Sequence, residues 1–264
     1  MTEHVLIEVC VESVASALAA ERGGAQRVEL CSDLLEGGVT PSIGLIEAVR
    51  SRISIGLHPI IRPRAGDFCY TEEEFDVMRR DLEIAKTSGV DGVVLGILDP
   101  TGKVDLPRTR RLIELAHPLP VTFHRAFDMS ADLVQSLEDV CAVGAQRLLT
   151  SGGEQTCSDG VGMIAQLVNL ARNRIKIMAG GGIGLDNAAH IIQNTGVTEI
   201  HVGLGSPVTG PMLYRNPRVS LGKTHGREYD RTQVLEANVR KLTCAIEAAA
   251  GRRKQLNPDC RTLS

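Results

Sequence analysis

The sequence contains no tryptophan and few other aromatic residues. Only 3% of its 264 residues are aromatic, so few side chains are available to stack on the bases of single-stranded nucleic acid. The formal net charge of -3 at pH 7 gives no general attraction to phosphate backbones or to anionic membrane surfaces. We therefore expect neither nucleic acid nor membrane among the partners of this protein.

Long apolar runs and paired cysteine motifs are also missing. No stretch approaches the ~18 consecutive apolar residues of a membrane helix, and the opening residues lack the charge pattern of a signal peptide. The seven cysteines are an odd number, scattered along the chain, which is typical of free thiols in a reducing compartment. We expect a cytoplasmic protein, with a nuclear presence also allowed if the source is eukaryotic.

Short apolar runs alternate with amphipathic stretches along the whole chain. The strand-like runs cover 5–10, 27–31, 56–61, 92–98, 121–124, 147–150, 175–178 and 199–202. The helical stretches cover 13–22, 43–50, 72–88, 107–117, 130–143, 159–172, 186–194 and 231–249, and Thr71 with Glu74 has capping-box spacing. About eight βα units predict a single-domain α/β protein, a (β/α)8 barrel of the TIM type.

Two segments do not follow this alternation. Residues 206–229 contain Pro and Gly without a clear period, and we expect them to form a subunit contact or to cover one end of the barrel. This predicts a homo-oligomer, a dimer or a tetramer. The barrel is expected over 1–250, and the basic residues 251–264 are expected to form a flexible tail.

The site of such a barrel lies at the carboxyl ends of its strands. Alternation along the strands places Glu8, Glu29, Arg62 and His124 toward the interior as a polar layer. One interpretation is a buried ion-pair network alone. The other is an active site in which His124 moves protons, Glu8 or Glu29 orients it, and Arg62 or Arg64 holds an anion.

Charged loops and glycine clusters extend this candidate site. Arg64 and Asp67 follow the third strand, and Asp128 follows the fifth, which completes the catalytic candidates. The glycine clusters follow the last three strands and comprise Gly152, Gly153, Gly180, Gly181, Gly182, Gly203 and Gly205. Exposed amides at such turns are typical of phosphate binding, and the alternative is that the glycines only permit tight turns.

Two cysteines occupy matching positions after matching glutamates. Adjacent parallel strands lie about 4.8 Å apart, so Cys10 and Cys31 can bring two sulfurs to one soft ion such as Cu(I) or Zn(II). The alternative is that both are buried as small apolar residues. Cys69 is a candidate third donor if its loop folds over the mouth, whereas Cys141 lies in a helical stretch and is expected to pack.

Seven sequence segments carry a family resemblance. They are Glu8–Cys10, Glu29–Cys31, 36–42 (EGGVTPS), 61–70 (IRPRAGDFCY), 123–128 (FHRAFD), 149–153 (LTSGG) and 180–182 (GGG). Together they strongly resemble the CutC copper homeostasis family, with Ala65 standing where members often have Gly. The resemblance implies a TIM-type barrel, a cytoplasmic homo-oligomer and, as in animal members, Cu(I) binding through Cys10 and Cys31, but it implies no reaction.

Two functional hypotheses follow. The leading one is a copper-binding barrel that takes part in copper homeostasis, with Cu(I) bound by the thiolates of Cys10 and Cys31. The alternative is an enzyme that acts on a small anionic or phosphorylated metabolite at the same barrel mouth.

Overall fold

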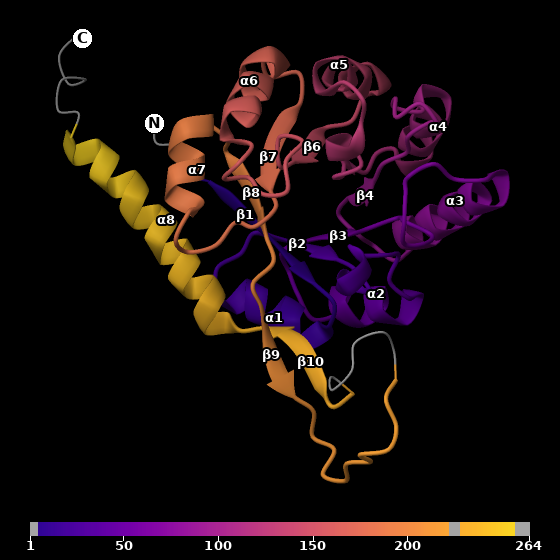
Figure 1. Ribbon diagram of the computed structural model, residues 1–264, viewed down its shortest axis with the longest axis vertical. Helices are drawn as coiled ribbons and strands as arrows, with labels where there is room; N and C mark the ends of the chain where they lie inside the picture. The colour runs from indigo at the N-terminus through magenta and orange to yellow at the C-terminus, as the bar shows by residue number, and fades with distance from the viewer. Residues whose placement is uncertain (1–4, 222–227, 257–264) are drawn as a thin grey trace.

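Eight parallel strands form the centre of the molecule in the computed structural model, which describes residues 5–221 and 228–256 (Figure 1). The strands are β1 (Leu6–Val11), β2 (Arg27–Leu30), β3 (Gly56–Pro59), β4 (Val93–Leu95), β5 (Val121–Phe123), β6 (Arg147–Thr150), β7 (Lys176–Gly180) and β8 (Glu199–Val202). Their order is β3-β2-β1-β8-β7-β6-β5-β4. A bridge between Ile60 and Val94 brings the two ends of this order together, so the TIM-type barrel is confirmed.

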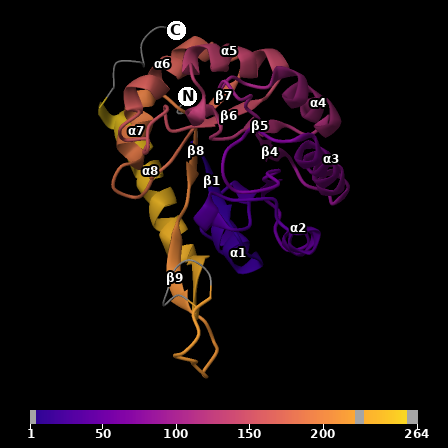
Figure 2. The same cartoon turned by 45° about the vertical axis from the view of Figure 1, so that its right-hand side comes forward.

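Helices follow the strands and cover the outside of the barrel, as Figure 2 shows from a second direction. They are α1 (Val14–Arg22), α2 (Ile43–Arg50), α3 (Glu72–Thr87), α4 (Leu106–Ala116), α5 (Leu133–Val143), α6 (Val161–Ala171), α7 (Ala188–Thr195) and α8 (Glu236–Leu256). The predicted capping box is present, because Thr71 accepts from the amide of Glu74 and the Glu74 side chain accepts from the amide of Thr71. This pairing fixes the start of α3.

The core lies between the outer faces of the strands and the helices. Ile7 and Val9 of β1, and Val28 and Leu30 of β2, are buried there. Successive side chains of a strand point to opposite faces, so Glu8 and Cys10 point into the barrel. The apolar alternation of the first strand therefore predicts correctly which face meets the helices.

The segment after β8 differs from the sequence prediction. Gly205–Thr209 forms β9, which pairs antiparallel with β10 (Asp230–Val234). The hairpin projects from the barrel and carries an extended loop (Figure 1). The prediction that the last helix starts at residue 231 is wrong, because residues 230–234 pair with a strand some 25 residues earlier and α8 begins only at Glu236.

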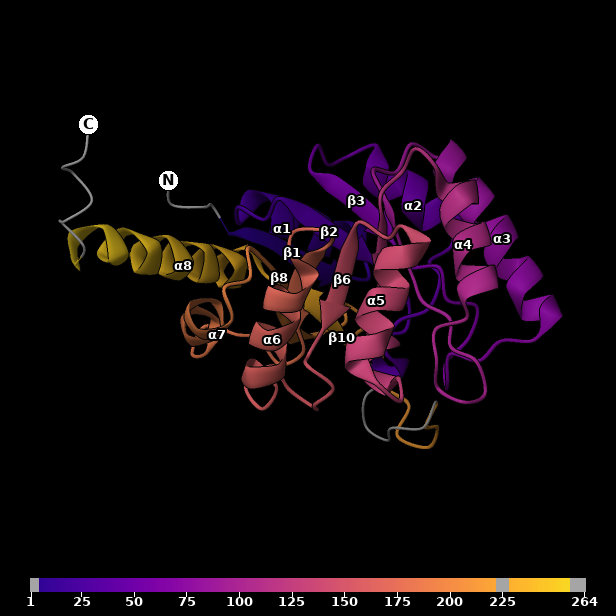
Figure 3. The same ribbon diagram turned by 90° about the horizontal axis from the view of Figure 1, so that it is seen from above.

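The last helix lies along one side of the barrel. α8 packs against α1 and α7 (Figure 3) and ends at Leu256. Of the predicted tail, residues 257–264 lie outside the described residues. None of the helices in the described ranges has the length and apolar character needed to cross a membrane.

Candidate metal centre

Two thiols lie side by side at the mouth of the barrel. Cys10 is opposite Glu29 in the register of β1 and β2, and Cys31 directly follows β2, where its amide donates to the carbonyl of Val11. The two Sγ atoms are 3.6 Å apart, and Cys10 Sγ is 3.4 Å from Glu29 Oε2. Sulfur, sulfur and carboxylate oxygen all lie within 4.8 Å of one another.

Apolar residues and a loop cover one side of the thiols. Cys10 and Cys31 pack with Ile60 and Val94 in a small buried cluster. The loop after β2 folds over Cys31, because residues 32 and 39 bridge and bring Gly38 close to the sulfur. Gly38 has φ of +86°, and a Cβ atom there would lie 3.2 Å from Cys31 Sγ. A larger residue would be strained and crowded at this position.

The two thiols have different acidities. The hydrogen bond with Cys31 is the main cause that lowers the pKa of Cys10, to about 6, while burial raises this pKa and His201 lowers it. The same hydrogen bond and burial raise the pKa of Cys31 well above its usual range. Burial and the neighbouring Cys10 thiolate raise the pKa of Glu29 well above its ordinary value. These shifts make Cys10 the more acidic thiol of the pair.

A chain of ion pairs lies beneath the thiols inside the barrel. His201 Nδ1 is 2.8 Å from Glu8 Oε1, and its Nε2 is 3.6 Å from Glu29 Oε2. Burial would lower the pKa of His201, but hydrogen bonds to Cys10 and Glu8 raise it well above its usual value. Glu8 also pairs with Arg27, whose charge holds the pKa of that carboxyl well below its usual range against the effect of burial. These contacts hold His201 beside the thiols.

The ion pairs continue to the opposite wall. Arg27 Nη2 and Arg147 Nε each lie 2.6 Å from Glu199 Oε2. The sequence predicts one polar layer inside the barrel, but the structure places its two glutamates at different depths. Glu8 belongs to the buried network, whereas Glu29 lies at the cavity above it.

A cavity of about 160 Å³ opens at the barrel mouth. Its polar lining comes from five strands or the loops that follow them, and Phe68 and Leu149 are among its apolar residues. The polar residues are Cys10, Glu29, Arg62, His124, Arg125 and His201. The sequence candidates Glu29, Arg62 and His124 are therefore brought together with Cys10.

The other charged candidates lie apart from this lining. Arg64 pairs with Glu74 at 2.5 Å and with the largely exposed Asp67 at 3.1 Å. Asp128 accepts from Arg125 Nε at 2.7 Å and from the hydroxyl of Thr150 at 2.5 Å. Arg64, Asp67 and Asp128 thus already have protein partners.

The glycine clusters also stand outside the cavity lining found among the described residues. The amide of Gly153 donates to Asp128 and that of Gly152 to Thr150, so protein oxygens occupy these two donors. A Cβ atom added to Gly180 would collide with the side chain of Leu149 and would lie 3.0 Å from His201 Cβ. Gly181 and Gly182 have positive φ values in the following turn, and Gly203 and Gly205 lead into β9.

Sequence reasoning missed His201 and Arg125 as site residues. His201 alternates with the buried Ile200 and Val202 along β8, so the alternation used for the first two strands would have found it. Cys69 is half-buried and is not in the donor cluster of the described residues, although its neighbour Phe68 does line the cavity.

Comparison with known proteins assigns the chain to a family. A sequence model of the CutC family matches residues 5–206. This chain belongs to the CutC family. A CutC family protein of Chromobacterium violaceum is 45% identical over 92% of this chain and 99% of its own length. The copper homeostasis protein cutC homolog of Mus musculus is 46% identical over 82% of this chain and 80% of its own.

One solved structure agrees with this assignment, and another shares the fold. A CutC crystal structure from Streptococcus agalactiae superposes with a TM-score of 0.72 at 34% identity, covering 75% of this chain and 97% of the other. Thiamine phosphate pyrophosphorylase of Pyrococcus furiosus has a TM-score of 0.57 at 16% identity and covers 94% of this chain and 98% of its own. The second likeness concerns the fold alone.

Proposed function

We propose that this CutC protein binds Cu(I) as cargo through the thiolates of Cys10 and Cys31 and thereby serves copper homeostasis. The observation that supports this most directly is the 3.6 Å separation of the two buried sulfurs. Thiolates are soft ligands that prefer Cu(I) to hard ions such as Mg²⁺ or Ca²⁺. The name of its mouse relative, a copper homeostasis protein cutC homolog, points to the same process.

The donor set fits a soft ion of low coordination number. Metal–thiolate bonds are about 2.3 Å long in zinc proteins, so two sulfurs 3.6 Å apart are both within reach of one ion. The cluster in the described residues offers three donors, Cys10, Glu29 and Cys31, whereas a structural zinc site uses four. The proton on Cys31 must leave when the ion binds, so binding is expected to release protons.

The test is an anaerobic competition titration with a chromophoric Cu(I) chelator. The Cys10→Ser and Cys31→Ser double variant should lose Cu(I) binding, while Mg²⁺ and Ca²⁺ should bind neither protein. Cys141→Ser is the matched control, because Cys141 lies on α5 away from the mouth, and it should keep the affinity. A folded double variant with unchanged Cu(I) affinity would refute the proposal.

We further propose a cytoplasmic homo-oligomer, a dimer or a tetramer, in which the hairpin arm (residues 205–234) contacts another subunit. Met212, Leu213 and Tyr214 are exposed by 55%, 96% and 67%, and exposed apolar groups of this kind favour an interaction surface. The six cysteines in the described residues are free, as a reducing compartment requires.

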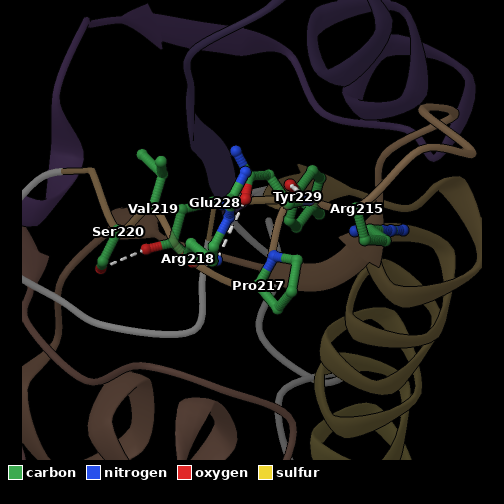
Figure 4. Close-up of a pocket in the computed structure, with 8 residues that line it drawn as sticks. Arg215, Pro217, Arg218, Val219, Ser220, Glu228 and Tyr229 are labelled. Atoms are coloured by element: carbon green, nitrogen blue, oxygen red, sulfur yellow. Dashed lines mark hydrogen bonds between the residues drawn. The ribbon is translucent and has the colours of Figure 1, made fainter.

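The arm has local structure of its own. Arg215 lies 4.1 Å over the Tyr229 ring, and the Tyr229 hydroxyl accepts from the amide of Asn216 (Figure 4). Light scattering should show a smaller assembly when residues 210–229 are replaced by a short Gly-Ser turn. An unchanged assembly size and stability would count against a role in subunit contact.

A second candidate function is an enzyme acting on a small anionic or phosphorylated metabolite at the same mouth. The observation in its favour is that Arg62 and His124 line one cavity with Cys10 and Glu29, as residues of an active site do. Turnover that is detected with a metabolite panel and lost in a folded His124→Ala variant would support it. A panel of anionic and phosphorylated metabolites that gives neither turnover nor a shift in melting temperature would reject it.

A further inference from the structure

One ring nitrogen of His124, a residue of the cavity lining, has no hydrogen-bond partner among the described residues. His124 Nδ1 accepts the amide hydrogen of Ala126 at 3.1 Å, so the neutral ring carries its proton on Nε2. Nε2 is buried and has no partner among the described residues. Burial and the nearby charge of Arg62 lower the pKa of His124 to about 3. The ring is therefore a neutral hydrogen-bond donor.

The packing of His124 orients this donor. A Cβ atom on Gly96 would lie 2.6 Å from Nδ1 and 2.7 Å from Cε1, so the Nδ1 edge of the ring rests against the backbone of Gly96. The Phe68 ring lies 5.0 Å away at a tilt of 53°. The Nδ1 edge is thus held against protein, whereas Nε2 is the unpartnered donor of a residue that lines the cavity.

Arg62 supplies a positive charge that lacks a negative partner. Its side chain is buried, and its guanidinium donates to the carbonyls of Glu36, Gly38 and Gly66 at 2.8 to 2.9 Å. These acceptors are neutral carbonyls, and Arg62 Nε has no hydrogen-bond partner in the ranges that the structure describes. A buried charge without a counter-charge is unfavourable. A bound anion would remove this cost.

The other cationic side chains of the cavity lining already have carboxylate partners. Arg125 is paired with Asp128, and His201 is paired with Glu8. Glu29, the acidic side chain of the lining, lies beside Cys10 Sγ at 3.4 Å and His201 Nε2 at 3.6 Å. Arg62 is therefore the cation of this lining that forms no ion pair with a carboxylate among the described residues.

We infer that the cavity binds a small organic carboxylate, one of whose oxygens accepts from His124 Nε2 while its charge faces Arg62. A volume of about 160 Å³ is similar to that of an engineered cavity of roughly 150 Å³ that accommodates benzene. The ligand therefore has about six non-hydrogen atoms or fewer, as acetate and lactate do. This inference deepens the second candidate function by naming a ligand class for the same cavity, and it requires neither copper nor turnover.

Two substitutions of His124 separate the two ring nitrogens. Asn places an oxygen near the position of Nδ1 and nothing at Nε2, so His124→Asn keeps an acceptor for Ala126 and removes the donor. Gln reaches the Nε2 position with an amide, so His124→Gln restores a donor there. Cys141→Ser on α5 is the control outside the cavity.

The experiment is a titration of the full chain with acetate, lactate, inorganic phosphate and chloride, followed by long-range ¹H–¹⁵N NMR of the His124 ring. Acetate or lactate should shift the Nε2 resonance of the wild type and of Cys141→Ser. His124→Asn should bind the same carboxylate at least about tenfold more weakly, because one hydrogen bond to a charged group is lost. His124→Gln should keep most of the affinity.

Three outcomes would overturn the inference. The first is an unperturbed His124 resonance with both carboxylates in the wild type, a result that does not depend on whether a variant folds. The second is chloride or phosphate binding as tightly as the carboxylates, and the third is equal carboxylate affinity in a folded His124→Asn variant. Cu(I) titration is a separate readout, so failure of the copper proposal and failure of this one are distinguishable. Carboxylate binding without turnover would reject the enzyme hypothesis but would support this inference.

Discussion

The buried neutral ring of His124 makes a quantitative prediction about acid stability. Its pKa in the folded chain is about 3, against 6.5 for an ordinary histidine, because burial and then the charge of Arg62 disfavour the imidazolium. Between these values the unfolded chain binds a proton that the folded chain does not, so stability falls as the pH falls from 6.5 toward 3. The contribution is fully present above 6.5.

The magnitude follows from the pKa difference. At about pH 5 the unfolded imidazole is about 1.5 pH units below its pKa, which corresponds to about 2 kcal/mol lost relative to about pH 8. His124→Asn removes this titration. The loss of unfolding free energy between the two pH values should therefore be smaller by about 2 kcal/mol in the variant than in the wild type.

Urea denaturation at the two pH values measures this difference. The comparison uses the change with pH within each protein, so a constant loss of stability in the variant cancels. His58, whose pKa burial lowers to about 4, titrates in both proteins and cancels as well. If the wild type and His124→Asn lose the same free energy between the two pH values, the ring is protonated in the folded state and the reasoning is refuted.

Three further predictions concern the barrel interior. Glu199→Gln should lower the unfolding free energy by about 3 kcal/mol, because its carboxylate is shared by Arg27 and Arg147; a urea midpoint near that of the wild type would contradict this. The ultraviolet thiolate absorbance of wild type minus Cys10→Ser should titrate near pH 6, and a midpoint near 9.0 would contradict the proposed effect of the neighbouring thiol. Gly180→Ala should cost about 1 to 3 kcal/mol through overpacking against the facing side chains, and thermal melting would detect it.

Much of the fold could be predicted because its determinants are local. The period of the apolar residues distinguishes strand from helix, and the repeated βα alternation leaves a parallel barrel as the simplest arrangement. Helix α2 runs over Ile43–Arg50 as its pattern predicts. The hairpin of β9 and β10 escaped prediction because its strands, GSPVT and DRTQV, pair over a long separation and have little apolar alternation.

The sequence by itself determined which residue types face the barrel interior, because alternation along a strand depends only on local backbone geometry. It brought Cys10 and Cys31 into one candidate site on that basis. Only the tertiary structure decided which charges are satisfied. Arg62 and Arg64 are two residues apart in one loop, yet Arg64 pairs with Glu74 whereas Arg62 turns inward to backbone carbonyls. Such partners come from distant segments, and their positions depend on how the whole barrel closes.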